Sequence, residues 1–200
     1  MSHYFINDDS LKKELKYINY TFKGNTFKFA THAGIFSKEH VDGATDILLN
    51  TISAVPVRAT TGTAVLDMGC GYGCIGIVLA KTYSLKLTAT DINPAAVELT
   101  RLNCKLNGVE ADVTESDGFN RINGDFDAIV INPPIHAGKS VTYKMYEDSI
   151  KHLTAGGKLY VVTFKKHGAE STLAKIREVF DGRTEVIYKK KGIYVIAATS

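Results

Sequence analysis

The chain has 200 residues, of which 44% are apolar and 22% charged. This composition is typical of one globular domain and excludes a fibrous or largely disordered protein. No apolar run approaches the roughly 20 residues that a helix needs to span a bilayer. The polar, acidic start of the chain also lacks the form of a signal peptide. We therefore expect a cytoplasmic protein with no membrane partner.

Charge is unevenly distributed around the formal net value of +3. Residues 61–140 hold 6 basic and 9 acidic side chains, and residues 141–200 hold 11 and 6. The basic C-terminal part is compatible with a polyanionic partner, although most lysine-rich faces are simply solvated. Three cysteines provide neither a disulfide framework nor a zinc ligand set, so we expect reduced thiols and no metal.

The N-terminal part predicts a hairpin and a helix. Residues 17–22 and 27–31 alternate in hydrophobicity around the turn Lys23-Gly-Asn-Thr26, and residues 38–55 place apolar side chains at helical spacing. We interpret residues 1–60 as an extension of residues 61–200, the two together forming one domain. No composition shift or linker separates them.

From residue 64 onward, short apolar runs alternate with helical patterns. Strands are expected at 64–68, 85–90, 110–114, 127–132, 158–164, 183–189 and 193–199, with helical spacing around 75–79, 99–106, 143–153 and 173–180. This alternation predicts a doubly wound, Rossmann-like α/β fold with a mostly parallel seven-stranded sheet. A tight turn at Lys189–Gly192 makes the last strand antiparallel. Gly156 and Gly157 are predicted to end a helix.

A glycine-rich loop follows the first predicted strand of this core. Asp67 ends the strand, and Gly69, Gly71 and Gly73 lead into a helix. Glycines let the backbone approach a ligand closely, and a helix N-terminus offers free N–H groups. Gly71, Gly73 and Gly76 also fit the dinucleotide fingerprint, so this loop alone leaves open whether the cofactor is NAD or S-adenosylmethionine.

Three acidic residues help to distinguish between the two possible cofactors. Asp67, Asp91 and Asp117 each come at or just after the end of a predicted strand, where parallel sheets bind ligands. Asp91 stands 20 residues after Gly71, the place of a ribose-binding acid. A carboxylate beside the loop repels a pyrophosphate and suits a cationic ligand, which favours S-adenosylmethionine. The alternative for Asp67 is a purely local bond to the loop backbone.

The segment Asn132-Pro133-Pro134 closes the fourth strand of the core. Neither proline can donate a backbone hydrogen bond, so the Asn132 side-chain oxygen and the nearby carbonyls form a group of acceptors. Such a group can hold an exocyclic NH₂ by its two protons, with the nitrogen lone pair directed at a methyl donor. The alternative is a plain strand-ending turn.

Together these motifs resemble class I S-adenosylmethionine-dependent methyltransferases that modify amino groups. More narrowly, the chain is similar to the methyltransferase small domain family, which includes ribosomal-RNA guanine-N2 methyltransferases. The residues that carry this likeness are the glycine loop and the segments Gly34-Ile-Phe-Ser-Lys38, Val41-Asp-Gly43 and Asn132-Pro-Pro-Ile-His-Ala-Gly-Lys139.

The resemblance implies a role for each of these positions. Cofactor binding falls to Asp67, Gly69, Cys70, Gly71, Gly73, Asp91, Ile92, Asp117, Gly118 and Asn132, and the target amine to Asn132 and Pro133, with the substrate further contacted by Phe36, Ser37, Pro134, Ile135, His136 and Lys139. Ile135 departs from the family pattern, because relatives that act on flipped bases often have Tyr or Phe there. Phe36 or Tyr143 could stack instead. For His136 we favour positioning over proton transfer, and Lys139 could meet a phosphate or be solvated.

The expected activity is methyl transfer to an exocyclic amine, with guanine N2 of ribosomal RNA as the substrate. Protein glutamine N5 and adenine N6 of DNA or RNA are alternatives within the same chemistry. Outside this chemistry, the sequence leaves open an NAD-dependent oxidoreductase, supported only by the 71/73/76 glycine spacing, and a catalytically silent RNA chaperone.

Overall fold

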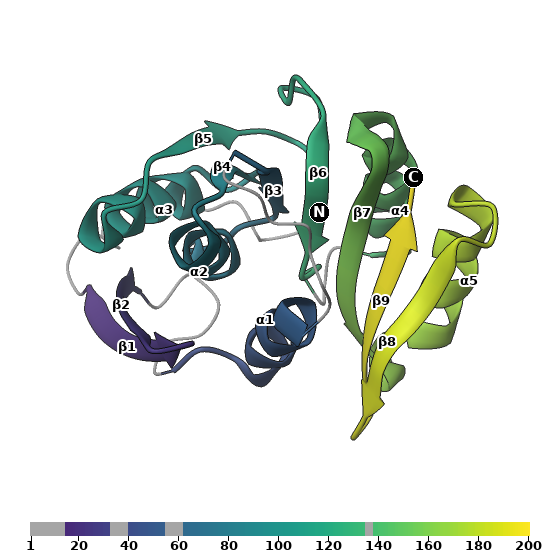
Figure 1. The fold of residues 1–200 in the computed structure, drawn as a ribbon, viewed down its shortest axis with the longest axis horizontal. Helices are drawn as coiled ribbons and strands as arrows, with labels where there is room; N and C mark the ends of the chain where they lie inside the picture. Colours follow the sequence, from purple (N-terminus) through teal and green to yellow (C-terminus); the bar gives the residue numbers. More distant parts are fainter. Residues whose placement is uncertain (1–14, 33–39, 55–61, 135–137) are drawn as a thin grey trace.

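A computed structural model describes residues 15–32, 40–54, 62–134 and 138–200, which form a seven-stranded sheet, five α-helices, two short 3₁₀ helices (Ile150–His152 and Lys165–His167) and a separate hairpin (Figure 1). The elements are β1 (Lys16–Phe22), β2 (Asn25–Thr31), α1 (Gly43–Ala54), β3 (Ala64–Met68), α2 (Cys74–Tyr83), β4 (Lys86–Asp91), α3 (Pro94–Asn107), β5 (Ala111–Glu115), β6 (Phe126–Ile131), α4 (Lys139–Ser149), β7 (Leu153–Phe164), α5 (Ala169–Val179), β8 (Thr184–Lys190) and β9 (Ile193–Thr199). None of the described helices is long and apolar enough to cross a membrane.

The strand order of the large sheet is β5-β4-β3-β6-β7-β9-β8. β5, β4, β3, β6 and β7 pair in parallel, whereas β9 lies antiparallel between β7 and β8. The predicted doubly wound sheet with an antiparallel last strand is thereby confirmed. The direction of strand addition reverses between β3 and β6, and ligands bind at this kind of position in open α/β sheets.

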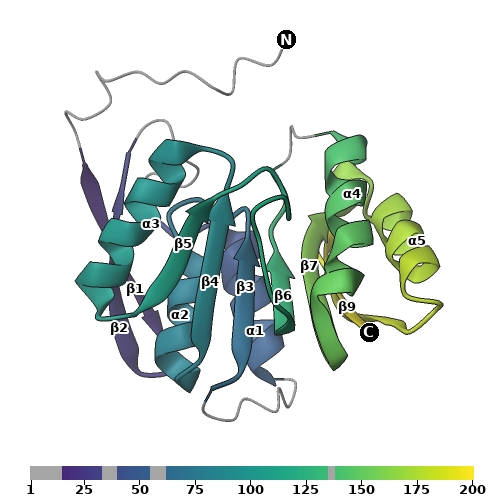
Figure 2. The same cartoon turned by 90° about the horizontal axis from the view of Figure 1, so that it is seen from above.

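The two faces of the sheet carry separate apolar clusters, because successive strand residues point to opposite sides. In β3, Val65 packs with α1, α2 and α3 on one face, and Leu66 packs with α4 and α5 on the other. Figures 1 and 2 show this arrangement, with the hairpin lying outside α3. The helices on both faces explain why the central strands are almost continuously apolar.

The prediction that Gly156 and Gly157 end a helix is wrong. The helix α4 already ends at Ser149, and both glycines lie inside β7, which begins five residues before the predicted strand. Gly156 has φ +78°, and a Cβ at Gly157 would lie 2.8 Å from the Thr154 carbonyl oxygen. The two glycines accommodate an irregularity in the pairing of β6 with β7. A glycine pair is typical both of such an irregularity and of a helix C-terminus, so the sequence alone does not distinguish the two.

The helix α1 begins at Gly43, so residues 40–42 of the predicted helix 38–55 are not helical. Asp42 ends that stretch as an N-cap, because its Oδ1 accepts the N–H groups of Ala44 and Thr45 at 3.0 Å each. The Tyr20 hydroxyl of β1 donates to Asp46 Oδ1 at 2.8 Å. The first turn of α1 is therefore fixed by its own cap and by the hairpin.

Two asparagines of α3 attach the hairpin to the core. Asn103 Oδ1 accepts the Ala30 N–H at 2.7 Å, and its Nδ2 donates to the Ala30 carbonyl at 3.0 Å and to the Tyr72 carbonyl at 2.8 Å. Asn107 pairs with Lys28 of β2 in the same two-way manner. The two amides stand one helical turn apart and satisfy the edge of β2 that pairs with no other strand among the described residues.

We expect Asn103→Ala to lower the free energy of unfolding by about 2 kcal/mol. Asn103 is completely buried, and its loss leaves three backbone polar groups without their partner. Urea denaturation at neutral pH measures the change. Asn120→Ala is the matched control, because Asn120 is exposed and should change stability by less than about 0.5 kcal/mol. Equal stabilities for the two variants would show that the asparagine ladder does not hold the hairpin.

Candidate active site

The carboxyl ends of β3, β4, β5 and β6 meet at one edge of the sheet, and each provides a predicted site residue. Asp67 lies in β3, Asp91 ends β4, Asp117 follows β5, and Asn132 follows β6. The register places Asp67 beside Val130 of β6 and beside Ala89 of β4. The structure thus places the four positions at the carboxyl ends of four neighbouring strands, with Asp67 and Asn132 at the two strands between which the strand order reverses.

Asp67 is 1% exposed and accepts the Gly76 N–H of α2 through Oδ2 at 2.8 Å. Burial raises the pKa of Asp67 to about 7, and the nearby charge of Asp91 adds to that rise, while the Gly76 bond opposes it. The local backbone bond considered as an alternative is therefore present. It occupies one lone pair of the carboxylate and leaves the others for a second partner.

Gly76 has a packing role. A Cβ at this position would lie 2.6 Å from Leu87 Cδ1 and 3.0 Å from Asp67 Cβ. Only glycine lets α2 lie this close to β3 and β4 and donate to Asp67. The third glycine of the dinucleotide fingerprint is thus explained by close helix–sheet packing, the role that this glycine also has in dinucleotide-binding folds.

The glycine loop has an open backbone. Gly69 and Gly71 have φ values of +74° and +59°, and a Cβ on either would meet no atom within 4 Å. The N–H groups of Gly69 and Cys70 donate to the Thr90 carbonyl at 2.8 and 2.9 Å, which attaches the loop to β4. Gly73, with φ +83°, is the N-terminal cap of α2. The bonds to Thr90 thus hold the loop on β4, while the open space beside Gly69 and Gly71 can accept a ligand.

Asp91 connects the glycine loop to the next loop along the sheet edge. Its Oδ2 accepts the Gly71 N–H and its Oδ1 accepts the Asn93 N–H, both at 2.9 Å. Burial raises its pKa. The adjoining Ile92 is 43% exposed, an unusual position for a large apolar side chain. A carboxylate beside an open apolar surface suits a ribose with its attached ring.

The loop after β5 carries Asp117 and Gly118. The Ser116 hydroxyl donates to the Gly118 carbonyl at 2.9 Å, and Asp117 itself is exposed. Phe119 is buried and stacks on His152, with ring centroids 4.7 Å apart. This stacking fixes the position of the loop.

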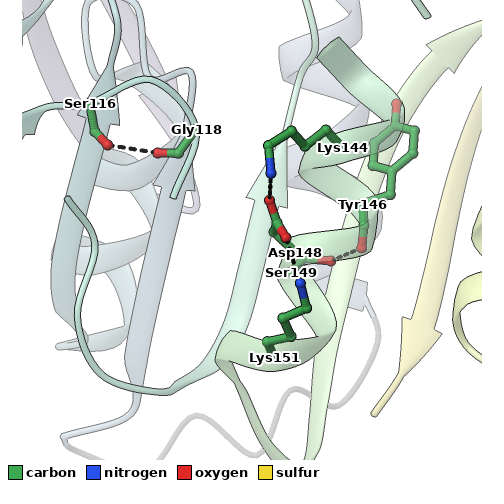
Figure 3. A network of polar contacts seen from close by, with 7 residues as sticks. All are labelled: Ser116, Gly118, Lys144, Tyr146, Asp148, Ser149 and Lys151. Carbon is green, nitrogen blue, oxygen red and sulfur yellow. Dashed lines mark hydrogen bonds and ion pairs between the residues drawn. The ribbon is translucent and has the colours of Figure 1, made fainter. Parts of the chain in front are cut away.

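The helix α4 lies across from this loop (Figure 3). Here Asp148 accepts from Lys144 and Lys151 at 2.7 and 2.8 Å. These three side chains form a network of ion pairs on the protein surface, with Lys151 in the 3₁₀ turn that follows α4.

Asn132 is half-buried at the end of β6, and its Nδ2 donates to Thr45 Oγ1 at 3.1 Å. No described residue donates to Asn132 Oδ1. Pro133 and Pro134 have no N–H to compete for a donor. The amide is thus held by its nitrogen and presents its oxygen, as the predicted acceptor group requires.

A cavity of about 130 Å³ adjoins Asn132 on the side of α4 and β7. The predicted residues Pro133, Pro134 and Lys139 line it, together with Tyr143, Thr163, Phe164 and His167. Tyr143 therefore lies at this cavity. From the sequence it is a candidate to stack on the substrate, because position 135 is isoleucine. The sequence analysis missed Thr163, Phe164, His167 and Thr45, because their places depend on contacts between distant segments.

Four predicted substrate residues, Phe36, Ser37, Ile135 and His136, lie outside the described residues. Cys70 is buried, and its Sγ lies 3.4 Å from Thr100 Oγ1, so only its backbone faces the loop. Burial raises the pKa of the Cys70 thiol well above its ordinary value. Within the described part of the chain, no group of three or more His, Cys, Asp or Glu side chains could hold a metal ion.

Fold and site together define a class I S-adenosylmethionine-dependent methyltransferase. The methyltransferase small domain model matches residues 26–197, and the chain belongs to that family. The chain is 36% identical over 200 residues to the uncharacterized protein YbxB of Bacillus subtilis, covering 97% of that protein.

The chain is also similar to larger proteins. It is 34% identical over 148 residues to ribosomal RNA small subunit methyltransferase C of Escherichia coli, with 72% of the chain and 41% of that protein covered. A T. thermophilus 16S rRNA N2 methyltransferase, solved with AdoMet and guanosine, matches 93% of the chain with a TM-score of 0.84 and 23% identity. The chain spans only about half the length of this structure and about two fifths of the E. coli enzyme.

Proposed function

We propose that the chain transfers a methyl group from S-adenosylmethionine to an exocyclic amine, guanine N2 of ribosomal RNA. The observation that carries this proposal is the Asn132 amide, which is held through Nδ2, accepts no hydrogen bond from a described residue at its oxygen, and lines the cavity. An oxygen acceptor beside a proline backbone binds the protons of an NH₂ and leaves its lone pair for attack. Alignment of this kind is worth several kcal/mol of barrier.

The residues at the sheet edge fit S-adenosylmethionine, which supplies an electrophilic methyl group on a sulfonium. Asp67 and Asp91 place two carboxylates at the glycine loop, which suits a cationic ligand with a ribose and disfavours the pyrophosphate of NAD. Ile92 provides the apolar surface for an adenine ring. Asp117 and the Gly118 backbone would meet the polar edge of that ring. The packing role of Gly76 is also that of the third glycine in dinucleotide-binding loops, so what disfavours NAD is the pair of carboxylates at the loop.

Lysines gather at the same edge of the sheet as this site. Lys165 and Lys166 follow β7, whereas Lys190 ends β8 and Lys191 begins the turn to β9. The Lys165 N–H donates to the Gly192 carbonyl at 2.7 Å, which brings the two segments together. Arg183, another residue of the basic C-terminal part, lies at the opposite end of β8. A basic surface beside the acceptor site supports an RNA substrate.

We expect Lys190→Gln with Lys191→Gln to weaken RNA binding and to reduce the slope of log K against log salt by about two. Filter binding of a ribosomal RNA fragment at several salt concentrations measures this slope. The matched control is Lys86→Gln with Arg183→Gln, because both side chains are exposed at the opposite end of the sheet. An equal change in both double variants would place the RNA elsewhere.

Three considerations support ribosomal RNA as the substrate. The chain belongs to a methyltransferase family, relatives carry the name ribosomal RNA small subunit methyltransferase C, and the basic surface lies at the site. This substrate implies a cytoplasmic location.

The decisive experiment offers tritiated S-adenosylmethionine with RNA, DNA and protein from cells lacking the gene. N2-methylguanosine in digested ribosomal RNA is the expected product. Label in protein glutamine, in adenine N6 or in no fraction would overturn the proposal.

A further inference from the structure

Thr45 makes the contact that fixes the Asn132 amide, and it comes from a part of the chain that precedes the sheet. Its Oγ1 accepts the Asn132 Nδ2–H at 3.1 Å, across 87 residues of sequence. Thr45 is 3% exposed, so the hydroxyl faces the protein interior. The contact joins α1 to the loop that follows β6.

From this contact we infer that Thr45 is a positioning residue for the reaction, and this inference rests on the proposed function. An asparagine amide can present either its oxygen or its NH₂ group after a half-turn of its end. Only the oxygen can accept the protons of a target amine. In the structure the Thr45 hydroxyl accepts from the amide nitrogen, and no described residue donates to the amide oxygen, which therefore stays available to the target amine.

The position of Thr45 is itself determined by two neighbours. Its own N–H donates to Asp42 Oδ1 at 3.0 Å, and the next residue, Asp46, accepts from the Tyr20 hydroxyl at 2.8 Å. The hairpin, the N-cap of α1 and the acceptor amide are thereby connected through one helical turn. The N-terminal hairpin and helix thus form part of the apparatus that orients the acceptor.

The test replaces Thr45 in the full chain and measures methyl transfer to RNA. Thr45→Val keeps the shape and removes the acceptor, and should lower kcat about tenfold. The affinity for S-adenosylhomocysteine should stay within about twofold. Thr45→Ser restores the hydroxyl and should recover kcat to within about threefold of the parent. Thr51→Val, on the same helix and half-buried, is the matched control and should leave kcat unchanged.

A double-mutant cycle shows whether Thr45 acts through Asn132. Added to Asn132→Ala, the Thr45→Val change should have no further effect on kcat. An equal tenfold loss in both backgrounds, or normal kcat in Thr45→Val alone, overturns the inference. If Thr45→Val fails to fold, Thr45→Ala replaces it in the same cycle.

Failure of the inference and failure of the proposed function give different results. When Asn132→Ala alone keeps normal turnover, the acceptor site itself is wrong. When Asn132→Ala is inactive but Thr45→Val is not impaired, only the positioning role is wrong.

Discussion

Replacing Asn132 by alanine is expected to lower kcat roughly 10²–10³-fold, the usual cost of losing a preorganised hydrogen-bonding group from a polar transition state. The Asn132 oxygen has no donor among the described residues, and its amide nitrogen is held by Thr45. As the amine nitrogen becomes positively charged during methyl transfer, its N–H groups become stronger donors. The acceptor oxygen therefore binds the transition state more tightly than the substrate.

We therefore expect kcat and kcat/KM to fall together in Asn132→Ala. Single-turnover transfer of tritiated methyl groups to RNA measures the chemical step directly. Affinity for S-adenosylhomocysteine should change by less than about threefold if the amide mainly serves the acceptor. Asn120→Ala, exposed in the loop after β5, is the control. Turnover of Asn132→Ala within threefold of the parent would contradict the acceptor role.

Much of the fold follows from local sequence periodicity. The strands predicted at 64–68 and 193–199 have the bounds of β3 and β9, and the other strands of the large sheet are located correctly but with shifted ends. Buried parallel strands form nearly continuous apolar runs, and these runs are easy to recognise in the sequence. The antiparallel direction of the last strand follows from the short turn predicted at Lys189–Gly192.

The errors arise where one residue type serves two structural purposes. Gly156 and Gly157 fit a helix end, but they also fit a strand irregularity, and the pairing of β6 with β7 decides between the two. The predicted start of α1 is too early because Val41 continues the apolar spacing that Asp42 then interrupts as a cap. Periodicity locates the centre of an element better than its ends.

The site is predictable to the extent that strand ends determine it. Asp67, Asp91 and Asn132 can be placed together because parallel strands bring their carboxyl ends to one edge. The partners that hold them cannot be found this way. Thr45 reaches Asn132 from 87 residues away, and Asn103 reaches Ala30 from 73, and no local pattern encodes such contacts.

Donor binding is expected to depend on the protonation of Asp67. Burial raises its pKa to about 7, so the donor-free folded protein keeps a proton that the unfolded chain has released well below neutral pH. The folded state then binds more protons, and its free energy of unfolding falls as pH rises from about 4 to 7. A cationic ligand needs the carboxylate. Its affinity should therefore rise about tenfold per pH unit up to pH 7 and level off above.

Calorimetry with S-adenosylhomocysteine, which carries the same ammonium group, measures this dependence. At pH 6, titrations in buffers with different ionisation enthalpies should show about 0.9 proton released per molecule bound. Asp67→Asn keeps an oxygen for the Gly76 N–H but loses the charge, so affinity at pH 7.5 should fall about 100-fold and lose its pH dependence. The control is Asp181→Asn, because Asp181 is exposed beyond α5 and its φ of +50° suits asparagine. An affinity for the parent protein that stays constant from pH 5 to 8 would mean that the buried carboxylate does not face the positive charge of the ligand.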